Sequence, residues 1–173
     1  MPFESVKQNR EIVGLRRKQE VQMGFFTENE VNTFDFGEAH IAELRFGLGS
    51  FYMLLDNVKI LENNSRNRDV RTMRTNGLTF RIMEPQIVAV TEEGCKIYNA
   101  DGVLQQEVPD RAVSPEEYAS LCKELEDAVI YKLEKTDDTY RIFIDGEEHE
   151  YVLEVKGSGD SEEWERFMNL AEI

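Results

Sequence analysis

Cysteine is scarce in this chain, and so are the other residues that build catalytic and metal sites. The 173 residues include two cysteines and two histidines. Cys95 and Cys122 lie too far apart for a CxxC motif, and two thiols make no disulfide framework. No glycine-rich phosphate loop or calcium loop is complete. We therefore expect no cofactor, no bound metal and no enzyme activity.

Long apolar segments are also missing. No apolar run approaches the length of about 18 residues that a membrane-spanning helix needs. The first ten residues contain no apolar core of a secretion signal. The sequence therefore predicts a cytoplasmic protein that does not bind membranes. Residues 63–69 are all polar and are expected to form a loop.

Positive charge is deficient in the second half of the chain. Residues 1–85 hold equal numbers of acidic and basic side chains, so the whole formal net charge of −15 lies in residues 86–173. Like charges repel one another in a compact state and deter nucleic acid. Direct binding of nucleic acid is therefore not expected. Three roles could explain the excess of acidic residues in the second half: solubility, binding of a cationic partner, or mimicry of nucleic acid.

Short strand-like segments fill much of the sequence. Leu44, Phe46 and Leu48 alternate with polar residues or glycine, as half-buried strands do. Phe51, Met53 and Leu55 alternate in the same way. Further strands are predicted at residues 87–91, 95–99, 103–108, 129–135, 139–145 and 147–155. Turn signals between them indicate hairpins.

Two tight turns are predicted from dipeptides. Asn76-Gly77 accepts the positive φ angles of a two-residue type I′ turn, which predicts a hairpin over residues 71–82. In that register Arg74 and Arg81 share one polar face. An Asp-Gly pair at 145–146 predicts a second hairpin.

Two amphipathic helices are predicted, one after each run of strands. Ser114 is a suitable N-cap, and Glu117 completes a capping box for a helix that ends near Ala128. A flexible joint at residues 157–159 precedes a second helix over residues 160–171. Residues 4–22 fit either a helix or an irregular segment.

The expected fold is therefore α+β, with a mostly antiparallel, sandwich- or barrel-like β-sheet and two amphipathic helices. A single domain, 1–173, is the expectation at this length. The alternative is two intimate halves. Residues 1–110 would form a β-rich half, and residues 111–173 would hold a helix, a three-stranded meander and a C-terminal helix.

Two groups of charged residues are candidates for binding a partner. Guanidinium groups near hydroxyls can grip phosphate or carboxylate, and carboxylates spaced over a strand can imitate a phosphate backbone. A charged, solvated strand face is the simpler interpretation of both groups. The basic group is Arg66, Arg68, Arg74 and Arg81, and the acidic group is Glu148, Glu150 and Glu154.

The histidines and cysteines favour structural roles. His149 lies on a predicted apolar strand face, with no partner for acid–base catalysis visible in the sequence. His40 lies near Glu38 and Glu43, but this spacing matches no common metal site. Cys122 falls on the apolar stripe of the first predicted helix, which indicates packing.

The sequence favours a non-catalytic protein-interaction or assembly module. A basic segment and an acidic half on one chain suit head-to-tail association, with itself or with a protein partner. Two alternatives stay open. One is an acidic nucleic-acid mimic that inhibits a DNA- or RNA-binding protein, and the other is a carrier of a small apolar ligand.

Overall fold

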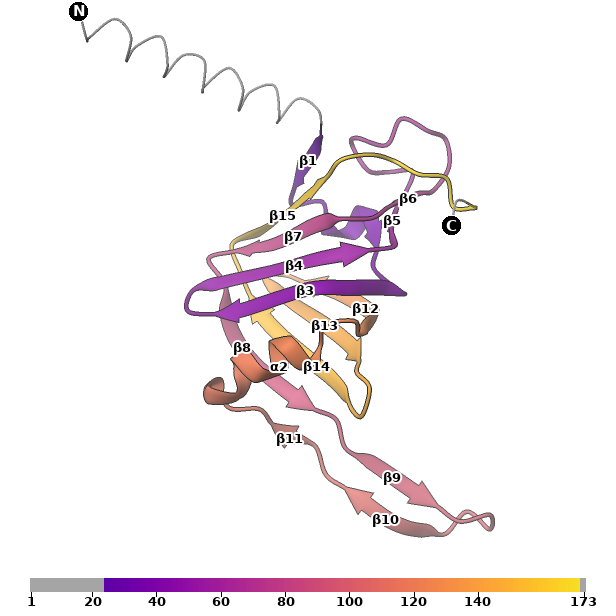
Figure 1. Ribbon diagram of the computed structural model, residues 1–173, viewed down its shortest axis with the longest axis vertical. Helices are drawn as coiled ribbons and strands as arrows, with labels where there is room; N and C mark the ends of the chain where they lie inside the picture. Colours follow the sequence, from indigo (N-terminus) through magenta and orange to yellow (C-terminus); the bar gives the residue numbers. More distant parts are fainter. Residues whose placement is uncertain (1–23, 172–173) are drawn as a thin grey trace, which may run out of the picture.

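The structure is a computed structural model that describes residues 24–171, and it is dominated by one large β-sheet (Figure 1). The ten strands of this sheet lie in the order β1-β15-β7-β4-β3-β12-β13-β14-β8-β11. All of its neighbouring strands are antiparallel. The predicted antiparallel, β-rich character is thus confirmed. The predicted segment 4–22 lies outside the described residues.

The strands divide into a large sheet and two small ones. In sheet order, the large sheet contains β1 (Phe25–Glu28), β15 (Gly159–Trp164), β7 (Leu78–Met83), β4 (Ser50–Asp56), β3 (Ala39–Gly47), β12 (Val129–Thr136), β13 (Thr139–Asp145), β14 (Glu150–Lys156), β8 (Gln86–Glu92) and β11 (Arg111–Ala112). The small sheets contain β2 (Phe34–Asp35), β5 (Val58–Ile60) and β6 (Met73–Thr75), and separately β9 (Cys95–Tyr98) and β10 (Leu104–Val108).

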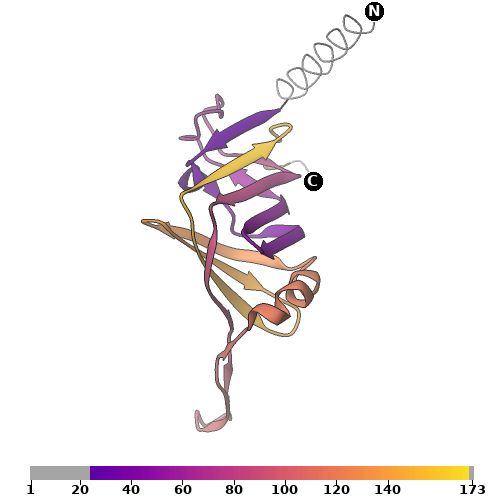
Figure 2. The ribbon, with the colours of Figure 1, turned by 90° about the vertical axis from the view of Figure 1, so that its left-hand side faces the viewer.

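The large sheet folds over on itself, so that its two halves enclose the core (Figure 2). On one side β3 and β12 join through two residue pairs. On the other side β7 leads into β8, and β14 leads into β15. The rings of Phe80 and Tyr140 meet across the core, with centroids 6.2 Å apart. The alternation predicted around Phe51 and Met53 places both side chains in this core.

The prediction of a second amphipathic helix is wrong. Residues 159–164 form strand β15, which is hydrogen-bonded between β1 and β7. Asp160, Glu162 and Trp164 all face the interior, with side chains at most 1 % exposed. Pairing with two neighbouring strands outweighs the helical spacing of the apolar residues in this segment, because local preference is weak beside tertiary contacts.

One α-helix is present among residues 24–171. A 3₁₀ turn (Pro115–Glu117) leads into α2 (Tyr118–Glu124), and the capping box predicted at Ser114 and Glu117 is confirmed. The helix ends before Ala128 and buries Leu121 and Cys122. No helix in the described part of the chain is long and apolar enough to cross a membrane.

The tight hairpin predicted at Asn76-Gly77 is wrong as well. β6 pairs with β5, whereas β7 pairs with β4 and β15, so the chain passes from a small sheet to the large one at this point. Gly77 has a φ of 71°, while Asn76 does not take a positive φ. As a result Arg74 is buried and Arg81 is exposed, and the two do not share a polar face.

Candidate functional site: a projecting hairpin and its base

The hairpin of β9 and β10 projects from the body of the molecule (Figures 1 and 2). We call residues 95–108 the arm. Among residues 24–171 its strands pair only with each other, with Cys95 opposite Val108 and Tyr98 opposite Leu104. Every residue of the arm is exposed. The arm therefore lies outside the core that holds the other strands.

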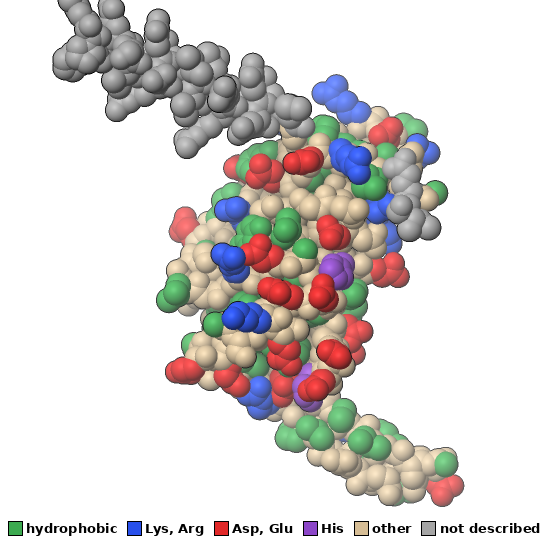
Figure 3. Space-filling view, in the orientation of Figure 1, with side chains coloured by type: hydrophobic (Ala, Val, Ile, Leu, Met, Phe, Trp, Pro, Cys, Tyr) green, Lys and Arg blue, Asp and Glu red, His purple; other side chains and the backbone are tan. Residues whose placement is uncertain are grey.

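Both faces of the arm carry apolar side chains, beside Gln106 on one face and the Lys96–Glu107 ion pair on the other. Cys95, Ile97 and Val108 lie on one face, and Tyr98 and Leu104 lie on the other. Five large hydrophobic side chains of the arm are 39–56 % exposed, namely Ile97, Tyr98, Val103, Leu104 and Val108. Hydrophobic side chains accordingly line the arm in Figure 3. A two-stranded hairpin is marginally stable alone in water, and an exposed apolar patch marks an interaction site.

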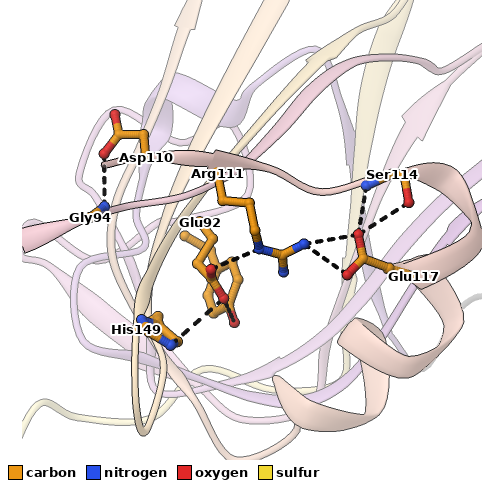
Figure 4. A network of polar contacts seen from close by, with 8 residues as sticks. Glu92, Gly94, Asp110, Arg111, Ser114, Glu117 and His149 are labelled. Atoms are coloured by element: carbon orange, nitrogen blue, oxygen red, sulfur yellow. Dashed lines mark hydrogen bonds and ion pairs between the residues drawn. The ribbon is translucent and has the colours of Figure 1, made fainter. Parts of the chain in front are cut away.

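The base of the arm is a close crossing of two backbone segments. The backbone N–H of Gly94 donates a hydrogen bond of 2.7 Å to Oδ1 of Asp110 (Figure 4). A Cβ at Gly94 would lie 1.9 Å from the carbonyl oxygen of Val108 and 2.6 Å from the carbonyl carbon of Pro109. Only glycine therefore fits at this crossing.

Just below the crossing, Arg111 joins the strands that enter and leave the arm. Arg111 on β11 lies opposite Glu92 on β8, and its Nε is 3.0 Å from Glu92 Oε2. Its Nη1 is 2.8 Å from Glu117 Oε1, at the start of the helical segment. Glu117 also accepts a hydrogen bond from the backbone N–H of Ser114. We call Glu92, Arg111 and Glu117 the clamp (Figure 4).

Two residues of the β13–β14 hairpin extend the clamp. The Tyr151 hydroxyl donates a hydrogen bond of 3.2 Å to Oε1 of Glu92, and Nε2 of His149 lies 3.7 Å from the same oxygen. His149 thus has a carboxylate neighbour. The sequence did not indicate this neighbour, because Glu92 lies on a distant strand and reaches His149 only through the fold.

The electrostatics of the clamp suit a fixed connection better than proton transfer. The hydrogen bond from Arg111 holds the pKa of Glu92 below its usual range. The backbone N–H of Ser114, and then Arg111, lower the pKa of Glu117. Burial raises the pKa of Tyr151 to about 12. A general acid or base works best with a pKa near the working pH, and these shifts move all three groups away from neutrality.

The structure separates the four candidate arginines. Arg66 and Arg68 are exposed in the loop between β5 and β6, at the end of the molecule opposite the arm (Figure 1). Arg74 is 8 % exposed, and its Nε donates to the carbonyl of Asn169. The Arg81 guanidinium lies over the ring of Tyr52, 5.2 Å from its centroid.

The three candidate glutamates are also divided. Glu148 lies in the turn before β14, and Glu150 begins that strand. The carbonyl of Glu150 accepts a hydrogen bond from the backbone N–H of Glu93, so this pair adjoins the base of the arm. Glu154 lies farther along β14 and pairs with Arg141 at 3.0 Å. The row of like charges is therefore interrupted by a cation.

The remaining titratable candidates occupy separate places. Nε2 of His40 is 3.2 Å from Oδ1 of Asp127, and neither Glu38 nor Glu43 is its ion-pair partner. No group of three or more histidine, cysteine or acidic side chains within residues 24–171 could hold a metal ion. Burial raises the pKa of the Cys122 thiol, whereas Cys95 is exposed on the arm.

The exposure of the arm was not predicted from the sequence, although its two strands were. The available signal is a pair of strand breakers, Gly94 and Pro109, at matching positions on the two sides of the hairpin.

No protein-family model, no curated protein and no solved structure matches this chain. Its function is therefore inferred from the geometry of the arm and its base.

Replacing Gly94 by alanine is expected to displace the arm without unfolding the body. The new Cβ would overlap the backbone of Val108 and Pro109, so the crossing must open. Amide hydrogen exchange over residues 95–108 should then rise several-fold, while exchange in β13 and β14 should stay slow. Gly102→Asn at the tip is the control, because a Cβ there meets nothing within 4 Å and asparagine tolerates its φ of 78°. Unchanged exchange in Gly94→Ala would contradict the close crossing.

Proposed function

We propose that this chain is a non-catalytic protein-interaction module that docks onto a protein partner through the arm. The observation that carries the proposal is the exposure of large apolar side chains on both faces of a projecting ribbon. A ribbon with exposed apolar side chains on both faces suits insertion between two surfaces better than contact with one flat surface. Its free strand edges also offer backbone hydrogen bonds to a partner.

The arm alone supports a modest affinity. Each of its five exposed apolar side chains can still bury about half of its surface, which stabilises a complex by about 1 kcal/mol per residue. Association itself costs about 4–15 kcal/mol. The apolar contact therefore needs help from further contacts around the base of the arm. The clamp also favours binding, because a hairpin that is already held in one direction loses less conformational entropy when it binds.

The acidic-mimic and ligand-carrier alternatives have less support. A mimic needs a continuous row of carboxylates, and Arg141 neutralises Glu154 within that row. A carrier needs an open interior, and aromatic side chains such as Phe80 and Tyr140 fill the space between the sheet halves. The interaction proposal therefore has the strongest support.

Site-directed crosslinking tests the proposal. Of the two cysteines, Cys95 is exposed on the arm and Cys122 is buried, so a thiol-reactive photocrosslinker attaches selectively at Cys95. In an extract of the native host, we expect Cys95 to crosslink to one protein, identified by the sequence of the crosslinked peptide. A second copy of this chain counts as such a protein. Crosslinks spread over many unrelated proteins would contradict a specific docking surface.

Substitution of the arm should abolish this crosslink. The arm variant, Ile97→Thr with Tyr98→Thr and Leu104→Thr, keeps residues that favour strands but removes the apolar contact. We expect its crosslinking yield to fall at least about tenfold, since three side chains at about 1 kcal/mol each exceed the 1.4 kcal/mol of a tenfold change. Val88→Thr is the control, because Val88 is 48 % exposed on β8, outside the arm. Equal yields from the arm variant and the control would refute the proposal.

A further inference from the structure

We infer that the partner of the arm is a basic protein, and that its arginine side chains contact a second surface beside the base of the arm. The inference rests on the proposed function of the arm and names the chemistry of its partner. Two features carry it. One is a patch of apolar and aromatic side chains on the outer face of the sheet, and the other is a row of carboxylates along the edge of that patch.

The patch lies on β12, β13 and β14, in the half of the large sheet from which the arm projects (Figure 1). Phe143 alternates with the buried Ile142 and Ile144, so it lies on the outer face of the sheet, opposite Val152. Tyr131 is the extra residue of a β-bulge in β12, and its ring centroid is 5.7 Å from that of Phe143. Tyr131 is 44 % exposed. We call this patch the shelf, and its residues are Val129, Tyr131, Phe143 and Val152.

Carboxylates border the shelf where β8 enters the arm. Asp145 on β13 lies directly opposite Glu150 on β14, and the backbone N–H of Glu93 donates to the carbonyl of Glu150. Burial, and then a hydrogen bond to Glu150, raise the pKa of the Glu93 carboxyl. Like charges at directly opposite positions on two strands destabilise a sheet. We call Glu93, Asp145 and Glu150 the acidic row, and a cation beside it would relieve this repulsion.

The shelf and the acidic row form one surface. Val129 of the shelf lies directly opposite Asp145 of the row. Burial, and then the charges of all three carboxylates of the row, raise the pKa of the Tyr131 hydroxyl. No lysine, arginine or histidine within residues 24–171 forms an ion pair with a member of the row. The nearby Lys132 is already paired with Glu134, at 3.2 Å. The negative charge beside the shelf is therefore left without an ion-pair partner in the described part of the chain.

An exposed aromatic ring beside carboxylates suits an arginine side chain. A cation over the face of a tyrosine ring is attracted by the ring electrons, and a carboxylate binds a guanidinium through two parallel hydrogen bonds. Arginine makes both contacts at once because its guanidinium is planar, whereas the lysine ammonium acts as a point charge. The same sheet face already holds one such contact, since Lys132 Nζ lies 5.6 Å from the ring centroid of Phe143. An arginine of the partner would lie over Tyr131 in the same manner.

The charge of the whole chain favours a basic protein over a second copy. The formal net charge is −15, so two copies repel each other at long range. A protein with a basic surface is instead attracted, and complementary charges speed and orient the encounter. Its arginine contacts at the shelf would supply the further binding energy that the arm needs at its base.

Two synthetic peptides of equal length and charge test the preference for arginine. We expect an oligo-arginine peptide to bind at least about threefold more tightly than an oligo-lysine peptide in isothermal titration at physiological salt. Tyr131→Leu removes the ring but keeps an apolar side chain, so it should abolish this preference. Tyr131→Phe keeps the ring and should retain it. Equal binding of the two peptides to the wild type, or an unchanged preference in Tyr131→Leu, would overturn the inference.

A pair of matched double variants locates the binding surface. Asp145→Asn with Glu150→Gln, the row variant, should bind the oligo-arginine peptide at least about threefold more weakly than the control. The control is Asp137→Asn with Asp138→Asn, which lie exposed in the turn at the far end of the same hairpin. Both variants remove two negative charges, so a diffuse attraction to an acidic protein would weaken binding equally. Equal affinities in the two variants would therefore contradict a site at the shelf.

The crosslink from Cys95 tests whether the arm and the shelf bind the same partner. We expect the crosslinked protein to carry a net positive charge, and the row variant to lower its crosslinking yield at least about threefold relative to the control variant. A specific crosslink to an acidic protein or to a second copy of this chain would overturn the inference. So would an equal yield from the row variant and the control. In these cases the proposed function of the arm stands, whereas the absence of any specific crosslink would refute both.

Discussion

Replacing Glu162 by glutamine is expected to stabilise this protein at neutral and alkaline pH. Glu162 and Asp160 lie on the interior face of β15, and both are 0 % exposed. Thr27 Oγ1 donates to Glu162 Oε2 at 2.8 Å, and the Tyr140 hydroxyl donates to Asp160 Oδ2 at 2.6 Å. The other carboxyl oxygens, Asp160 Oδ1 and Glu162 Oε1, have no hydrogen-bond partner among the described residues. One shared proton would satisfy both.

The pKa of Glu162 shows the same need for a proton. Burial, and then the neighbouring Asp160 carboxyl, raise this pKa to about 10. In the unfolded chain the carboxyl loses its proton near pH 4.5. Between these limits the folded state holds a proton that the unfolded state has released, so stability is fully present below the unfolded pKa and falls as pH rises through the folded pKa. The loss is about 1.4 kcal/mol for each pH unit.

Glutamine removes this dependence because its amide reproduces the protonated acid. Its N–H can donate to Asp160, and its carbonyl oxygen can accept from Thr27. Urea unfolding between about pH 6 and about pH 9 should show falling stability for the wild type and a much flatter profile for Glu162→Gln. Glu163→Gln is the matched control, since Glu163 is the next residue on β15 and is exposed. Parallel profiles for the wild type and Glu162→Gln would contradict a shared proton.

Replacing Gly157 by valine is expected to lower the free energy of unfolding by about 3 kcal/mol, at the upper end for an overpacked site. Gly157 lies at the corner where β14 leads into β15, and its N–H donates to the carbonyl of Asp138 at 3.0 Å. A Cβ here would lie 2.2 Å from Ile82 Cγ2 and 2.9 Å from the carbonyl oxygen of Met83. The backbone would have to move, and with it the join between the two sheet halves.

This expectation reverses the flexible joint predicted at residues 157–159. Denaturant titrations of Gly157→Val and of Gly49→Asn give the comparison. Gly49 has a φ of 79°, which asparagine tolerates, and a Cβ there meets nothing within 4 Å. Gly49→Asn should therefore cost far less. If both variants unfold at the same denaturant concentration, the corner is as permissive as a flexible joint and the close contact is wrong.

Local features of the chain were predicted well. The strands around Phe51 and Phe143 and the capping box at Ser114 depend on residues within a few positions of one another. Alternation of apolar residues and the spacing of a cap act within a single turn or strand, so sequence alone carries them. The failures at Asn76-Gly77 and at Gly157 have a different origin. Both are points where the chain passes between sheet regions, and local turn chemistry does not specify the strand that each segment will join.

The candidate site shows the same division. The alternation in residues 95–99 and 103–108 was sufficient to predict two strands of the arm, because pairing across a short turn is local. They project because no other element in the described part of the chain packs against them, and their direction depends on Glu92, Arg111 and Glu117 meeting from three segments. The charge asymmetry between the halves of the chain was visible from composition. The gathering of Glu93, Asp110 and Glu150 at the base of the arm arises only when β8 pairs with both β11 and β14, because such long-range pairing is set by the packing of the whole core.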